Sequence, residues 1–154
     1  MSEFQDRRTI QEIVLNAGTV AIVGLSASEL RASNFVGYYL KRHGYRVVPV
    51  NPNEERVLGE RVYSSLLDVP EHIDVVDVFR DPAAVPQIAR EAVQVSAGAL
   101  WLQFGVISPD GAQIALDGGL SVVMDRCLKV EHARLLGRMH WMGFDTGVIA
   151  GSRR

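Results

Sequence analysis

Five short runs of apolar residues constrain what this chain can fold into. Each run is rich in valine, isoleucine or aromatic residues, and stretches with apolar residues at helical spacing separate them. Near-continuous apolar strands are typical of parallel sheets, whose two faces are both covered. The runs are Thr19–Gly24, Arg46–Asn51, Asp74–Phe79, Ala99–Phe104 and Leu120–Met124. Strands that alternate with helices predict an α/β fold: a Rossmann-like, doubly wound, mainly parallel five-stranded sheet with helices on both faces.

Capping residues mark where the helices between these strands begin. Ser33 is the predicted N-cap of a helix that runs to about His43 and buries Phe35 on its inner face. Asp81 and Ser108 are each followed by proline, which is favoured in the first turn of a helix, so two further helices start there. The remaining helical patterns cover residues 5–15 and, as a shorter piece, 64–69.

Length and composition describe a single globular domain. The chain has 154 residues, of which 47% are hydrophobic and 22% charged, so it can bury a sizeable core and is not intrinsically disordered. We predict one domain over residues 1–140 and a C-terminal tail over 141–154. The formal net charge is -2, so no basic excess indicates a nucleic-acid partner, and a phosphate ligand needs local features to hold it.

The single cysteine and the apolar stretches bear on metal content and compartment. One cysteine, Cys127, excludes an intramolecular disulfide and a multi-thiolate zinc site, and no metal-binding motif is present, so we expect no metal. A reducing, cytoplasmic compartment fits this cysteine usage. The most apolar stretch, Ala99 to Ile107, is interrupted by Gln103 and is too short to span a bilayer, so we expect no membrane association.

The loop after the first predicted strand is a candidate phosphate site, because ligands of open parallel sheets bind outside the carboxyl ends of the strands. Gly24 there lets backbone N–H groups approach a phosphate, and the following helix N-terminus adds partial positive charge. Ser26, Ser28 and Ser33 offer hydroxyl groups to such a ligand. Arg31 offers a positive charge. The loop matches neither the dinucleotide-binding glycine motif nor the P-loop, which leaves a turn glycine with surface serines as the alternative.

The end of the second predicted strand disfavours a nicotinamide dinucleotide. Dinucleotide-binding domains usually place an acidic residue there, where it binds the ribose 2′-hydroxyl. This chain has Asn51 and Pro52 at that place, and Glu54 follows slightly late. The asparagine–proline pair is either a plain loop start or a rigid edge on which a base can rest.

Two further strand ends carry candidate ligand residues. Phe79 and Arg80 follow the third strand. Because an arginine is seldom fully buried unpaired, Arg80 either pairs with Asp81 or reaches a phosphate. At the end of the fourth strand, Gln103 and Gly105 are better ligand candidates than the aromatic residues beside them, most of which we expect to pack.

The lone cysteine follows the last predicted strand. Cys127 lies beside Arg126 and close to Lys129, and nearby cations favour the thiolate. It is therefore a candidate redox thiol, and a half-buried, unreactive cysteine is the alternative.

The motifs at these strand ends, in their order and spacing, carry a resemblance over about residues 17–132. The matching stretches are Gly24-Leu25-Ser26, Arg31-Ala32-Ser33, Tyr39-Leu40, His43-Gly44-Tyr45, Val50-Asn51-Pro52, Leu58-Gly59, Tyr63, Ser65-Leu66, Asp77-Val78-Phe79-Arg80, Trp101-Leu102-Gln103-Phe104-Gly105 and Val123-Met124-Asp125-Arg126-Cys127. With them the chain resembles the small stand-alone CoA-binding proteins, which are similar to the N-terminal domain of the succinyl-CoA synthetase alpha subunit. One departure lies at Asn34, where family members often have a tyrosine.

The resemblance implies a Rossmann-like domain that binds coenzyme A or an acyl-CoA. It implies that the pyrophosphate lies at Gly24-Leu25-Ser26 and Ser28, the adenosine part at Asn51-Pro52 and Phe79-Arg80, and the pantetheine arm along Gln103-Phe104-Gly105. The candidates for the 3′-phosphate, which needs charge-assisted contacts, are Arg31, Lys41 and Arg42.

We therefore predict a binding module for coenzyme A rather than a complete ligase. The full synthetases also need a phosphorylated histidine in a second domain and a nucleotide-grasping partner, which these 154 residues do not encode. Two alternatives stay open, an NAD(P)-binding enzyme or sensor and a regulatory partner of an acyl-CoA ligase. A homodimer is also left open, with the N-terminal helix and Trp141-Met142 as its candidate contact.

Overall fold

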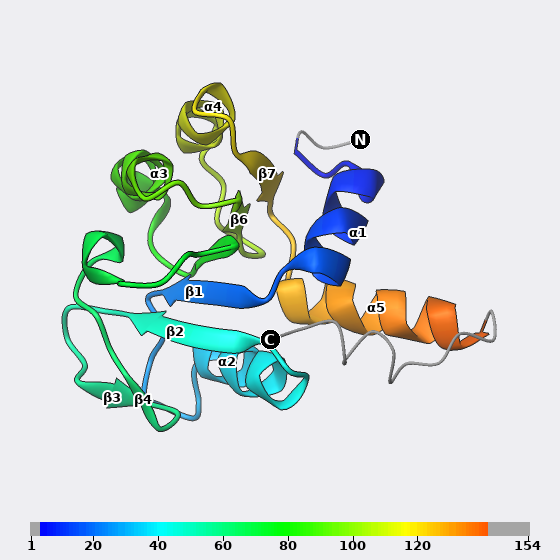
Figure 1. Cartoon of the computed structure of the whole chain (residues 1–154), viewed down its shortest axis with the longest axis horizontal. Coiled ribbons are helices and arrows are strands. Elements are labelled where there is room, and N and C mark those ends of the chain that lie inside the picture. The colour runs from blue at the N-terminus through cyan, green and yellow to red at the C-terminus, as the bar shows by residue number, and fades with distance from the viewer. Residues whose placement is uncertain (1–3, 142–154) are drawn as a thin grey trace.

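A five-stranded parallel sheet forms the centre of the computed structural model, which describes residues 4–141 (Figure 1). The strand order is β2-β1-β5-β6-β7, and every neighbouring pair in this sheet is parallel. The strands are β1 (Thr19–Val23), β2 (Arg46–Val50), β5 (Val75–Val78), β6 (Ala99–Leu102) and β7 (Ser121–Met124). The predicted doubly wound, Rossmann-like fold is confirmed.

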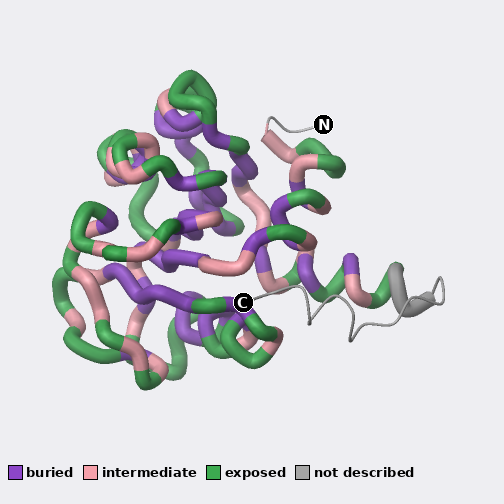
Figure 2. Tube along the Cα trace, viewed as in Figure 1, coloured by how far each residue is buried: buried purple, intermediate pink, exposed green. Residues whose placement is uncertain are grey.

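Helices cover both faces of the sheet and divide the core into two parts. One face packs against α3 (Val85–Gln94) and α4 (Pro109–Asp117), and the other against α1 (Arg7–Asn16), α2 (Ala32–Arg42) and α5 (Leu128–Trp141). All residues of β5 and β6 are buried, as expected for central strands covered on both sides. Figure 2 shows the buried segments running through the strands between these layers.

Two of the predicted caps are confirmed. Asp81 accepts a hydrogen bond from the backbone N–H of Ala83 at 2.9 Å and begins a short 3-10 turn, Pro82–Ala84, that leads into α3. Ser108 caps α4, because its hydroxyl oxygen accepts from the backbone N–H of Gly111 at 3.1 Å.

The predicted start and buried face of α2 were partly wrong. Arg31 is the N-cap, and Ser33 lies inside the helix, where its hydroxyl oxygen accepts from the backbone N–H of Ser26 instead of capping. Phe35 is 57% exposed, because the inner face of α2 carries Val36 and Leu40. The sequence offered no way to choose between a serine cap and a serine that turns back to the preceding loop.

Two elements of the structure were not predicted from the sequence. A hairpin of β3 (Arg56–Val57) and β4 (Glu60–Arg61) follows the second sheet strand, and α5 closes the described part of the chain. The short piece predicted at 64–69 is the 3-10 turn Leu66–Asp68. Beyond α5, the predicted tail from residue 142 onward lies outside the described residues. Within residues 4–141, no helix is long and apolar enough to cross a membrane.

Candidate functional site

The strand order reverses between β1 and β5, and their carboxyl ends meet at Gly24. The chain passes from β1 to β2 on one side and later to β5 on the other, and Val23 pairs with Val78. Gly24 has a φ of +92°, and a Cβ there would lie 3.2 Å from the carbonyl oxygen of Phe79 and 3.0 Å from Cδ of Arg80. Only glycine fits this turn without displacing the end of the neighbouring strand.

Side chains hold the loop after Gly24 in its shape. The amide of Asn34 donates to the carbonyl oxygen of Ser26 at 2.9 Å, and the amide of Asn51 donates to the carbonyl oxygen of Leu25 at 3.1 Å. Ser33 accepts from the N–H of Ser26 at 3.0 Å. Asn34, the departure noted above, therefore positions the loop. The side chain of Leu25 is fully buried, so only its backbone faces the loop.

A cavity of about 340 Å³ opens beside this loop, and we call it the loop cavity. It brings together Gly24, Ser26, Arg31, Ser33, Asn51 and Phe79, all predicted site residues, with Ala32, which was not predicted. Backbone groups, hydroxyl oxygens, an amide and a guanidinium thus surround one space, which suits a phosphate-bearing ligand.

Some predicted residues lie outside the loop cavity. Pro52 and Arg80 line a separate cavity of about 230 Å³ on the side of the sheet that α3 covers. The hydroxyl of Ser28 accepts from the backbone N–H of Leu30 at 3.3 Å in the exposed part of the loop. Lys41 forms an ion pair with Glu60 at 2.8 Å at the far end of α2.

A second cavity of about 650 Å³, the arm cavity, lies next to the loop cavity. Ala32 and Phe79 line both cavities, so the two cavities adjoin at these residues. Further along, the arm cavity is lined by the predicted residues Gln103, Phe104 and Cys127. Its other lining residues are Gln5, Val36, Asp125, Arg126, Val130, Glu131 and Arg134.

The residues after β6 shape the arm cavity in different ways. Gln103 is buried, and its side-chain oxygen accepts from the backbone N–H of Leu128, which anchors the start of α5. Phe104 is 77% exposed, which is unusual for a phenylalanine and leaves its ring free for a ligand. Gly105 donates its N–H to the carboxylate of Asp125 at 2.7 Å, which ties the β6 and β7 ends together.

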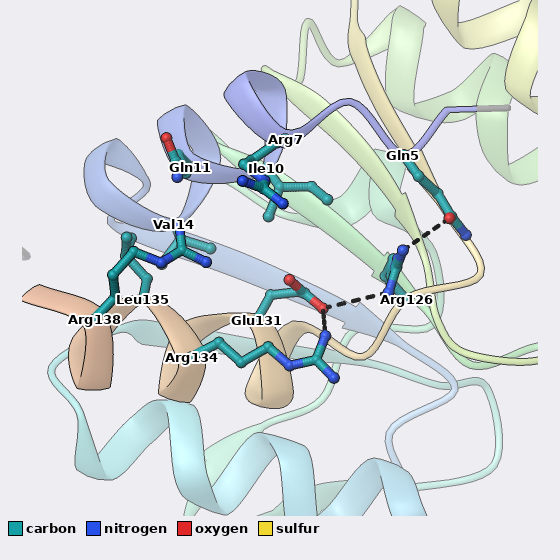
Figure 3. Close-up of a pocket in the computed structure, with 10 residues that line it drawn as sticks. All are labelled: Gln5, Arg7, Ile10, Gln11, Val14, Arg126, Glu131, Arg134, Leu135 and Arg138. Atoms are coloured by element: carbon teal, nitrogen blue, oxygen red, sulfur yellow. Dashed lines mark hydrogen bonds and ion pairs between the residues drawn. The ribbon is translucent and has the colours of Figure 1, made fainter. Parts of the chain in front are cut away.

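A third cavity of about 220 Å³ lies between α1 and α5, and we call it the arginine cavity (Figure 3). Its lining residues are Gln5, Arg7, Ile10, Gln11, Val14, Arg126, Glu131, Arg134, Leu135 and Arg138. Arg134 and Arg138 were not predicted as site residues, because α5 was not predicted and only its helical spacing places these two arginines on one side.

A buried carboxyl group lies near the middle of the sheet, below these cavities. Asp77 on β5 is fully buried, and neither carboxyl oxygen has a hydrogen-bond partner among the described residues. Burial raises the pKa of Asp77 well above its usual value, because the charged form loses its hydration. Among the described residues, no group of three or more His, Cys, Asp or Glu side chains can hold a metal ion.

Several known proteins are similar to this chain in sequence or in fold. The uncharacterized protein YneT of Bacillus subtilis is 36% identical over 124 residues, which covers 80% of this chain and 92% of that protein. A hypothetical protein from Pyrococcus horikoshii has a solved structure with a TM-score of 0.83 and 37% identity, covering 89% of this chain and 100% of its own. An ADP-forming acetate–CoA ligase of Archaeoglobus fulgidus is 30% identical over 78 residues, 49% of this chain and 12% of the ligase.

The family assignment follows from a match over most of the sheet. A family model described as a CoA binding domain matches residues 18–133, which begin just before β1 and end within α5. The match includes Gly24, the loop cavity and both strand ends that line the arm cavity. This chain belongs to the CoA-binding domain family.

Proposed function

We propose that the protein binds coenzyme A or an acyl-CoA along the carboxyl edge of its sheet, as a binding module without catalysis of its own. The observation that carries the proposal is that the loop cavity and the arm cavity are neighbours, since Ala32 and Phe79 line both; we call the route along the two the path. The loop cavity offers polar groups and a guanidinium, and the surface of the arm cavity is more apolar than polar. This order matches a ligand with a phosphorylated head and a long, less polar arm.

The parts of the ligand follow the path in order. In this proposal the pyrophosphate lies at the loop that starts with Gly24, and Asn51 and Phe79 contact the adenosine part. The pantetheine arm runs over Gln103 and Phe104 toward Cys127. Cys127 is half-buried in this wall and stays the candidate redox thiol.

The proposal also names a partner enzyme and a cellular compartment. Relatives of this chain include acetate–CoA ligases, so a separate acyl-CoA enzyme is the proposed partner, which this module would supply or regulate. A reducing, cytoplasmic compartment fits the single cysteine.

A homodimer contact through the apolar side of α1 is disfavoured, because Ile10, Ile13 and Val14 are buried within the chain itself.

One observation favours the dinucleotide alternative. The carboxylate of Glu54, after β2, accepts a hydrogen bond from the backbone N–H of Ala27 at 2.9 Å. An acidic residue after the second strand therefore lies beside the glycine loop, and dinucleotide-binding domains use an acidic residue after that strand to bind the ribose. In the CoA proposal, the same carboxylate competes with the pyrophosphate for that N–H.

Titration with coenzyme A, dephospho-CoA and NAD, measured side by side by calorimetry, tests the proposal. We expect coenzyme A to bind in the micromolar range, about -8 kcal/mol, and dephospho-CoA to bind more weakly. Glu54→Gln should strengthen coenzyme A binding by removing the competing charge, whereas it should weaken NAD binding if the carboxylate holds a ribose. Tighter binding of NAD than of coenzyme A, or binding of neither, would contradict the proposal.

A further inference from the structure

We propose that the arginine cavity receives a carboxylate at the far end of an acyl group, so that the protein prefers acyl-CoA molecules whose acyl group ends in a carboxylate. This inference rests on the proposed CoA site, which directs the thiol end of the ligand along the arm cavity. The arm cavity and the arginine cavity share Gln5, Arg126, Glu131 and Arg134. In this proposal, an acyl chain that extends past the arm cavity reaches these shared residues and, through them, the arginine cavity.

Positive charge outweighs negative charge in the arginine cavity. Among the described residues, four guanidinium groups and the single carboxylate of Glu131 line it. Glu131 accepts a hydrogen bond from Nη1 of Arg134 at 3.0 Å and lies 3.9 Å from Nη1 of Arg126, so one carboxylate serves two cations. In the described part of the chain, Arg7 and Arg138 have no carboxylate within ion-pair distance. A ligand carboxylate would supply the counter-charge that this wall lacks.

The cations come from separate elements that converge on the cavity. Figure 3 shows Arg7 on α1 and Arg134 and Arg138 on α5, with Arg126 beyond them. Arg126 donates from Nη2 to the side-chain oxygen of Gln5 at 3.0 Å, and its buried Nε has no hydrogen-bond partner among the described residues.

Arg7 occupies a position of a helix at which a positive charge is ordinarily unfavourable. It is the first residue of α1, where the positive end of the helix dipole disfavours a cation; the first turn holds no acidic residue, and the nearby carboxylate is that of the N-cap Asp6. A planar guanidinium matches a carboxylate with two parallel hydrogen bonds, so the cavity suits this end group.

Pairs of acyl-CoA molecules that differ only in the end group test the inference. Malonyl-CoA is compared with propionyl-CoA, and glutaryl-CoA with valeryl-CoA, because in each pair a carboxylate replaces a methyl group. We expect the carboxylate-bearing member to bind about tenfold or more tightly in calorimetric titration, as charge-assisted hydrogen bonds permit. Arg7→Gln and Arg138→Gln should weaken that member alone and so abolish the preference.

Arg8→Gln is the matched control. It removes the same charge from the neighbouring position of α1 but does not line the cavity, so it should keep the preference. Circular dichroism checks that each variant is folded.

The remaining outcomes separate this inference from the proposed function. Equal affinities within each pair, with coenzyme A still bound, overturn the inference and leave the CoA site standing. Failure of coenzyme A and every thioester to bind overturns both. If Arg7→Gln weakens coenzyme A but not dephospho-CoA, the cavity holds the 3′-phosphate and the acyl assignment is wrong. Binding of inorganic phosphate without any preference within the pairs assigns the cavity to a free anion and also overturns it.

Discussion

At the scale of single residues, Asp77 is the group whose burial has the clearest thermodynamic effect. Its carboxyl group stays protonated in the folded protein at pH values where the unfolded chain has released that proton, because burial raises its pKa. The unfolded state then binds fewer protons than the folded state, so this group lowers the free energy of unfolding as the pH rises above about 4. The loss continues until the pH reaches the raised pKa of the folded state.

Replacing Asp77 by asparagine should remove this pH dependence. The difference in unfolding free energy between Asp77→Asn and the parent protein should move in favour of the variant as the pH rises, by up to about 1.4 kcal/mol per pH unit. Urea unfolding of both proteins between pH 5 and pH 8 measures the difference, from which the other titrating groups cancel. Parallel stability profiles would show that the Asp77 carboxyl does not keep its proton on folding.

Gly24 gives a second prediction at this scale. In Gly24→Ala, alanine must adopt a left-handed φ, and its Cβ presses against the carbonyl oxygen of Phe79. We therefore expect at least about a tenfold loss of coenzyme A affinity and a loss of about 1–2 kcal/mol in the free energy of unfolding. Gly119→Ala is the control, since it has a φ of +91° but open space around its Cβ. It should lose stability through its backbone and keep coenzyme A affinity in the same titration. Equal affinity losses in both variants would speak against the loop assignment.

At the scale of the element, α2 separates the three candidate cations for the 3′-phosphate. Arg31 caps its N-terminus and lines the loop cavity, whereas Lys41 and Arg42 lie in its last turn. A helix of 11 residues is about 16 Å long, so the two ends cannot meet the same phosphate. Lys41 is also held by Glu60.

Arg31→Gln should therefore weaken coenzyme A by about tenfold or more while it leaves dephospho-CoA nearly unchanged, because only the former carries the 3′-phosphate. Calorimetry with both ligands measures the ratio. Arg90→Gln, an exposed arginine on α3, removes the same charge away from the site and should change neither affinity. A larger effect of Arg42→Gln than of Arg31→Gln would contradict this assignment.

Elements differed in how well the sequence predicted them, for physical reasons. The five sheet strands are buried on both faces, so their apolar runs stand out whatever surrounds them. The hairpin of β3 and β4 has strands of two residues each, too short for any periodic pattern. In α5 the apolar residues are spread among charged and polar residues, two of them arginines, so its helical pattern is weak, although Leu128 and Leu135 are buried.

At the scale of the whole molecule, the sequence located the edge of the sheet where the cavities lie, because strand ends can be read from the runs. It could not predict which side of that edge each residue faces. Phe79 and Arg80 are adjacent, yet they line cavities on different sides of the sheet. The arginine cavity depends on α1 packing against α5, two helices from opposite ends of the chain, and no local pattern encodes that contact.

Trp101 gives this protein a natural optical probe. Its buried indole donates a hydrogen bond to the backbone carbonyl oxygen of Arg126 at 2.8 Å, and the Arg126 side chain lines both the arm cavity and the arginine cavity. A ligand that shifts Arg126 changes the polarity around an indole ring whose fluorescence is sensitive to it. Occupancy at the acyl end of the path can thus be followed in real time by tryptophan emission without a dye or a label, once Trp141, the other tryptophan of the chain, is replaced by phenylalanine.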